Sequence, residues 1–182
     1  MKIACLAWGS LLWKAEPLVL ASPWHDDGPD LPLEFSRVGD HKELATTLLA
    51  TAPLQTTWWA LLAATSIAEA REQLRQREEI SLGHPEWIGT EPAKRRYPHH
   101  QSIGTWMSQR SLEAVVWTAL PPRYAGTEGR EPNPSEAAQY LDGLAGDDRV
   151  HAEDYVRRMP ARFSTPTRGE IERKLGWYPI ER

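Results

Sequence analysis

The sequence lacks the features that would mark a disulfide-rich or membrane-spanning protein. Its 182 residues include one cysteine, Cys5, which excludes a disulfide within the chain. No apolar run approaches the roughly 20 residues that a membrane-spanning helix needs. Trp8, Gly9 and Trp13 interrupt the apolar start of the chain, and no small-residue cleavage site follows. We therefore expect no signal peptide, no membrane partner and a cytoplasmic location.

The chain also has no excess of positive charge. The net charge of −4 gives no electrostatic support to a nucleic-acid partner, and the basic cluster 94–96 is interpreted as a solvated loop. No two of the six histidines stand at ligand spacing beside a carboxylate, so the sequence gives no support to a metalloenzyme. A Ser-His-Asp hydrolase is disfavoured because Ser10 lacks the second glycine of a nucleophile elbow.

The length is that of one domain, expected to span residues 1–182. Strand patterns gather in the first two thirds of the chain and helical patterns at its end, which indicates an α+β fold with a helical C-terminal third. The segment 81–111 is expected to be a long loop with a short strand near 103–107, and Val150 is expected to face inward. The expected strands are 3–8 (central), 33–38, 43–50, 57–64 and 113–120; the expected helices are 66–79, 134–144, 150–159 and 166–175.

The first candidate site follows the first predicted strand, in Trp8-Gly9-Ser10-Leu11-Leu12. A strand that ends in a Gly-Ser turn can direct successive backbone N–H groups at one point, where they bind a carboxylate or an oxyanion. Considered alone, these residues favour a plain turn, because any strand can end in Gly-Ser.

The second candidate is Glu78. Ile67, Ala70, Leu74 and Glu78 follow helical spacing, so the carboxylate continues the apolar stripe of the predicted helix. Burial and the negative end of the helix dipole both raise the pKa of a carboxylate in this position, towards the range that a general base needs near neutrality. The alternative is a surface position at which Glu78 pairs with Arg75 or Arg77.

These segments together resemble the gamma-glutamylcyclotransferase-like family, which includes the ChaC-type and AIG2-like proteins. WGSLLW (8–13) is similar to the family's Tyr-Gly-Ser signature, with Trp8 in place of tyrosine. LPLEFSRVG (31–39) and TWWALLA (57–63) follow in the family's order. LRQREEI (74–80) is similar to the stretch that carries the family's catalytic glutamate, with Glu79 where many members have Gly or Lys.

The resemblance implies a small mixed β-barrel or sheet with flanking helices, and a transferase or lyase activity. The substrate would be a small γ-glutamyl compound that cyclises to 5-oxoproline and releases an amine, a reaction that requires neither a metal nor an organic cofactor. Glu78 would be the catalytic acid and base, and Trp8, Gly9, Ser10, Leu11 and Arg37 would bind the substrate, with Arg37 as the candidate partner of its α-carboxylate. For Arg37 the sequence favours the alternative, an exposed arginine at the end of a strand. Trp87 and Trp117 are possible pocket walls, although the core is favoured for Trp117.

A non-catalytic module on the same fold, binding a small molecule or a protein, is the alternative. The two hypotheses differ over Glu78. An enzyme of this type requires a carboxylate withdrawn from solvent near Ser10, whereas a solvent-facing Glu78 would exclude the enzyme.

Overall fold

The computed structural model describes residues 1–92 and 97–180, so the basic cluster 94–96 lies outside the described residues. The chain divides into two compact units. The first comprises Met1–Leu31 and Thr56–Leu120; the second comprises Pro32–Gln55 and the chain from Pro121 onward. Each unit is described by itself, and a single domain over 1–182 stays a prediction. Among the described helices, none has the length and apolarity to cross a membrane.

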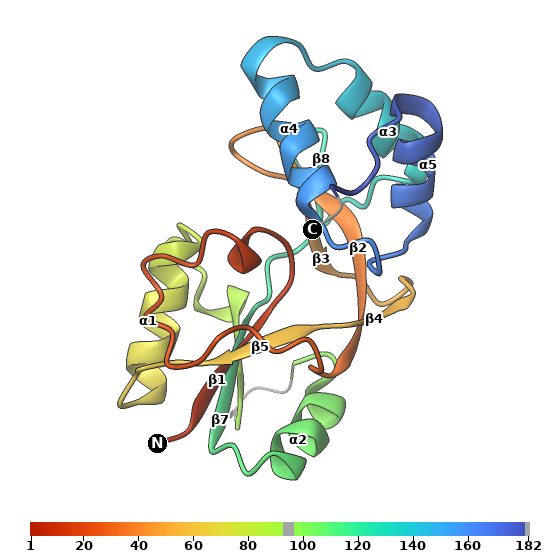
Figure 1. Cartoon of the computed structure of the whole chain (residues 1–182). Coiled ribbons are helices and arrows are strands. Elements are labelled where there is room, and N and C mark those ends of the chain that lie inside the picture. Colours follow the sequence, from red (N-terminus) through yellow and green to blue (C-terminus); the bar gives the residue numbers. More distant parts are fainter. Residues whose placement is uncertain (93–96, 181–182) are drawn as a thin grey trace. The chain divides into compact units, whose positions relative to one another are not determined.

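A four-stranded mixed sheet forms the centre of the first unit, in the order β5-β1-β7-β6 (Figure 1). β1 pairs in parallel with β7 and antiparallel with β5. Every residue of β1 is buried, which confirms the prediction of a central first strand. The strands are β1 (Ile3–Ala7), β5 (Trp58–Leu61), β6 (Ile88–Glu91) and β7 (Ala114–Thr118).

Helix α1 (Ile67–Arg77) packs on one face of this sheet. It begins where the sequence predicts, because the Ser66 side chain accepts a hydrogen bond from the Glu69 N–H. Ala70 and Leu74 join Cys5 and other residues of β1 and β7 in one buried cluster, with Ile67 packed against it. The expected apolar stripe is therefore the inner face of α1.

The segment 81–111 is more ordered than the sequence indicates. It contains a short 3-10 turn (η2, Pro85–Trp87), strand β6 and helix α2 (His100–Gln109), so the strand expected at 103–107 is wrong. The buried residues of α2, Ile103 and Trp106, are three positions apart. That spacing places both on one face of a helix, whereas in a strand they would point to opposite faces.

The second unit holds a five-stranded sheet in the order β3-β2-β8-β9, with β4 beside β2. Three helices follow, as predicted. The described strands form two open sheets and no closed barrel, so the fold class α+β is confirmed and the barrel is wrong. The elements are β2 (Asp30–Val38), β3 (Leu44–Leu48), β4 (Leu54–Thr56), β8 (Arg123–Tyr124), β9 (Thr127–Glu128), α3 (Pro134–Asp142), α4 (Gly146–Arg158) and α5 (Pro166–Leu175).

Val150 is the one inward residue of α4 that the sequence assigned wrongly. It is 67% exposed, whereas Tyr155, Val156 and Met159 are buried as expected. Ala152, which is also buried, completes the inner face at positions spaced by three and four residues. Val150 lies two residues before Ala152 and so falls on the solvent side of the helix.

The C-terminus of α1 is closed by a Schellman motif. Glu79 has a φ of 54°, in the left-handed region. Its N–H donates to the Gln76 carbonyl, and the Ile80 N–H donates to the Arg75 carbonyl. Ile80 then packs with Leu74 in the core. The motif explains why a glycine would suit this position, since glycine adopts a left-handed conformation without strain.

Replacing Glu79 by Gly is therefore expected to stabilise the protein. Removing the left-handed strain should raise the free energy of unfolding by up to about 1 kcal/mol. Chemical denaturation measures the change. Glu72→Gly, in the middle of the same helix, is the matched control and should lower the free energy by about 1 kcal/mol. Equal destabilisation by both variants would contradict the role assigned to Glu79.

Candidate functional site

The Gly-Ser turn follows β1 directly. Trp8 is extended, and Gly9–Leu12 forms one 3-10 turn (η1). Gly9 has a φ of 73°, a left-handed conformation that favours glycine. Trp8 and Leu11 are buried, while Ser10 is half-buried. In a 3-10 turn each N–H pairs with the carbonyl three residues before it, so the N–H groups of Gly9 and Ser10 have no acceptor within the turn and are directed outside it, whereas Leu11 has the Trp8 carbonyl three residues before it.

Glu78 is the residue at which α1 ends. Its N–H donates to the Leu74 carbonyl at 3.0 Å, and its side chain is only 15% exposed. The carboxylate therefore does not face solvent. Burial raises the pKa of the Cys5 thiol, and the charge of Glu78 raises it further, while Arg77 opposes this effect. The Glu78 charge therefore acts on Cys5 in β1, as the position of Glu78 on the apolar stripe of α1 predicts.

Arg77 connects the two candidate segments. Its Nη2 donates to Ser10 Oγ at 2.8 Å and to the Lys14 carbonyl at 2.8 Å. Its Nε donates to the same carbonyl at 3.0 Å. Nη1 lies 3.4 Å from Glu78 Oε1. The pairing of Glu78 with Arg77 that the sequence allowed does occur. It lies away from solvent, however, because the Arg77 side chain is 11% exposed.

Arg37 belongs to the second unit, on β2. The pairing register of β2 with β3 shifts between Phe35 and Arg37. The guanidinium makes a two-point contact with Glu128, at 2.6 and 3.0 Å, and donates to the Pro121 carbonyl at 2.9 Å. The residue is 7% exposed, so the exposed strand-end arginine that the sequence favoured is wrong. Arg37 binds a carboxylate, but that carboxylate is the protein's own.

The two remaining candidates, Trp117 and Trp87, pack against other ring side chains of the protein. Trp117 is fully buried in the core of the first unit, with the Tyr97 ring 5.6 Å away. Trp87 is half-buried and stacks on His84 at 3.9 Å. No group of three potential metal ligands occurs within residues 1–92 and 97–180.

Sequence reasoning assigned no site role to Arg77. The available signal was its position, since a cation in the last turn of a helix, next to the candidate Glu78, complements the helix dipole. Its long-range partners, Ser10 and Lys14, give no signal in the sequence.

Comparisons with known proteins add one structural likeness. No protein-family model matches the chain, and no curated protein does. A solved structure of a glutathione-specific gamma-glutamyl cyclotransferase from yeast is similar, with 13% identity, a TM-score of 0.47, and coverage of 97% of this chain and 98% of that one. A likeness of this degree leaves the substrate and the site residues of this chain open.

Replacing Arg77 by Met is expected to loosen the Gly-Ser turn. The substitution removes the donors to Ser10 and Lys14 and the positive charge beside Glu78, which should cost about 1–3 kcal/mol of unfolding free energy. Hydrogen exchange should accelerate at the Trp13 and Lys14 amides, which bond to the Ser10 carbonyl. Gln76→Met is the control, because Gln76 lies beside Arg77 in the last turn of α1 but is exposed. Unchanged exchange at both amides would show that Arg77 does not hold the turn.

Proposed function

We propose that the chain is a cofactor-independent gamma-glutamylcyclotransferase. The observation that supports this most strongly is the Arg77 guanidinium, which binds Ser10 of the Gly-Ser turn and contacts Glu78. The two segments that carry the family resemblance, 68 positions apart at Ser10 and Glu78, therefore share one side chain. Glu78 is also mostly withdrawn from solvent, as the enzyme hypothesis requires.

The reaction is an intramolecular aminolysis. The α-amine of a γ-glutamyl group attacks the γ-carbonyl carbon, the new C–N bond closes a five-membered ring, and the original C–N bond to the leaving amine breaks. Glu78 accepts a proton from the attacking nitrogen and donates it to the leaving nitrogen, so that protons balance over one turnover. Because nucleophile and electrophile belong to one molecule, holding the substrate in a folded conformation supplies much of the rate.

The Gly-Ser turn has the second role. As the carbonyl becomes tetrahedral, its oxygen gains negative charge, which backbone N–H groups stabilise when they are fixed in advance. The amides of Gly9 and Ser10 are the proposed donors, Leu11 flanks them in the same turn, and Arg77 fixes the turn that carries them. Trp8, buried at the start of the turn, is the proposed apolar wall.

Arg37 remains a prediction as the partner of the substrate's α-carboxylate. Its two-point contact with Glu128 weighs against that role, because a substrate carboxylate would have to displace an internal one. The identity of the leaving amine stays open, and glutathione is one γ-glutamyl compound among those to be tested.

The test is the release of 5-oxoproline from a panel of γ-glutamyl amines, amino acids and peptides, followed by mass spectrometry. We expect product with the wild type. Glu78→Gln keeps the shape of the side chain but cannot accept the proton, and should lower kcat/KM by about 10²–10⁴-fold. Glu79→Gln removes the neighbouring carboxylate and is the matched control, which should keep wild-type activity.

Two results would contradict the proposal. Equal activity in the wild type and Glu78→Gln would remove the proposed base. No product from any member of the panel would favour the alternative, a binding module in which the Glu78 carboxylate serves only to bind a ligand.

A further inference from the structure

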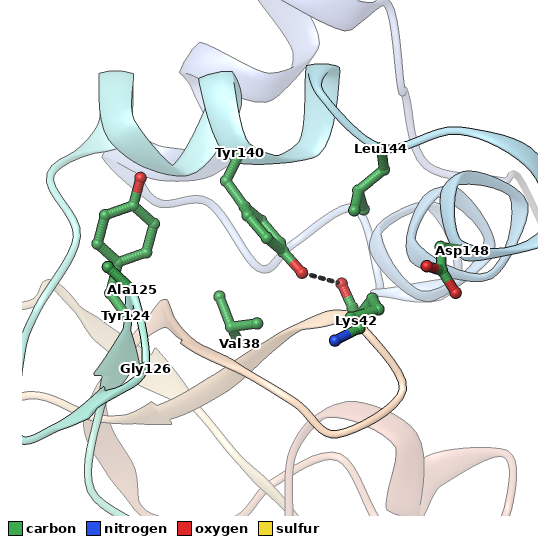
Figure 2. A pocket seen from close by; sticks show the side chains of 8 residues that line it. All are labelled: Val38, Lys42, Tyr124, Ala125, Gly126, Tyr140, Leu144 and Asp148. Carbon is green, nitrogen blue, oxygen red and sulfur yellow. Dashed lines mark hydrogen bonds between the residues drawn. The ribbon is translucent and has the colours of Figure 1, made fainter.

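A cavity of about 450 Å³ lies wholly within the second unit (Figure 2). Its volume is in the range of small-molecule sites, and no residue of the proposed catalytic site lines it. Four parts of the unit contribute: the end of β2, the turn to β3, the β8–β9 hairpin and the α3–α4 region. The lining residues are Val38, Lys42, Tyr124, Ala125, Gly126, Tyr140, Leu144 and Asp148.

The walls of the cavity are largely apolar. The rings of Tyr124 and Tyr140 stand edge to face, 6.4 Å apart, and both hydroxyls are already used by the protein. Tyr140 donates to the Lys42 carbonyl at 2.9 Å, and Tyr124 donates to the Glu136 carbonyl at 3.3 Å. The two rings therefore present carbon surface to an occupant, alongside Val38 and Leu144 (Figure 2).

The polar part of the cavity is a pair of opposite charges. Lys42 and Asp148 are both exposed, and within the described residues neither side chain makes a hydrogen bond or ion pair. Burial raises the pKa of Tyr140, and the charges of Glu43 and then Asp148 raise it further. The Asp148 carboxylate thus acts electrostatically on the wall of the cavity, where Figure 2 places it on the side opposite Tyr124.

Two hairpin turns hold the rim in place. Lys42 has a φ of 67° inside the turn between β2 and β3, which the Gly39 N–H closes by donating to the Glu43 carbonyl at 2.8 Å. Ala125 and Gly126 both have positive φ, which is the geometry of a type I′ turn between β8 and β9. The positions of Lys42 and of the Tyr124 wall are therefore set before any ligand binds.

We propose that this cavity binds a free α-amino acid with an apolar side chain. A zwitterion matches both charges at once, with its carboxylate on Lys42 and its ammonium on Asp148, whereas a simple cation or anion would leave one of them unmatched. The apolar side chain would lie against the two tyrosine rings, Val38 and Leu144. The proposal does not depend on the cyclotransferase activity, because no residue of the cavity belongs to that site.

Isothermal titration calorimetry of the full chain with L-leucine and L-phenylalanine tests the proposal, with leucinamide and N-acetyl-leucine as ligands that lack one charge each. Both amino acids should bind, and each of the two modified ligands should bind about five- to tenfold more weakly. Asp148→Asn and Lys42→Met should weaken the binding of leucine by a similar factor.

Asp147→Asn is the matched control, because Asp147 is the neighbouring exposed carboxylate in the first turn of α4 and does not line the cavity. It should bind leucine like the wild type. Circular dichroism checks that each variant folds. The proposal is overturned if neither amino acid binds at millimolar concentration, or if leucine binds equally well to the wild type, Asp148→Asn and Lys42→Met.

Discussion

The arrangement of the first unit's candidate site depends on the largely buried guanidinium of Arg77. Withdrawing an arginine and a carboxylate from water is costly unless both are paired and their hydrogen-bonding capacity is satisfied. Here Glu78 supplies the opposite charge, and Ser10 and Lys14, up to 67 positions away in the chain, supply the acceptors. These contacts hold the turn at the end of β1 at a fixed distance from the end of α1.

This arrangement explains why each segment is ambiguous in isolation. Gly9-Ser10 is compatible with any turn, and a glutamate at a helix end is compatible with any surface. The Schellman motif at Glu79 and Ile80 ends α1 just after Glu78, and the inner stripe of α1 directs that residue toward the sheet. A general base at this place needs no metal or cofactor beside it, because the proposed reaction moves one proton between two nitrogens of the same substrate.

Sequence reasoning was reliable where local signals determine the structure. Three of the expected helices, 66–79, 134–144 and 166–175, have local capping signals that the structure uses: the Ser66 cap, the capping box of Asn133 and Glu136, and the left-handed Gly176. Sequence reasoning failed where contacts between residues far apart in the sequence determine the structure. Helix α2 shows little periodicity outside Ile103 and Trp106, and the contact of Arg77 with Ser10 joins residues 67 positions apart in the sequence. Arg37 was identified as a carboxylate binder, but its partner Glu128 lies 91 positions away and could not be inferred.

The central claim is that the Gly-Ser turn and Glu78 form one site for a γ-glutamyl substrate. Its most direct test is the titration of 5-oxoproline, the proposed product, into ¹⁵N-labelled protein. The account predicts saturable shifts of the Gly9, Ser10 and Leu11 amides, and their loss in Arg77→Met. Shifts confined to other regions of the chain, or no shifts at millimolar 5-oxoproline, would contradict it.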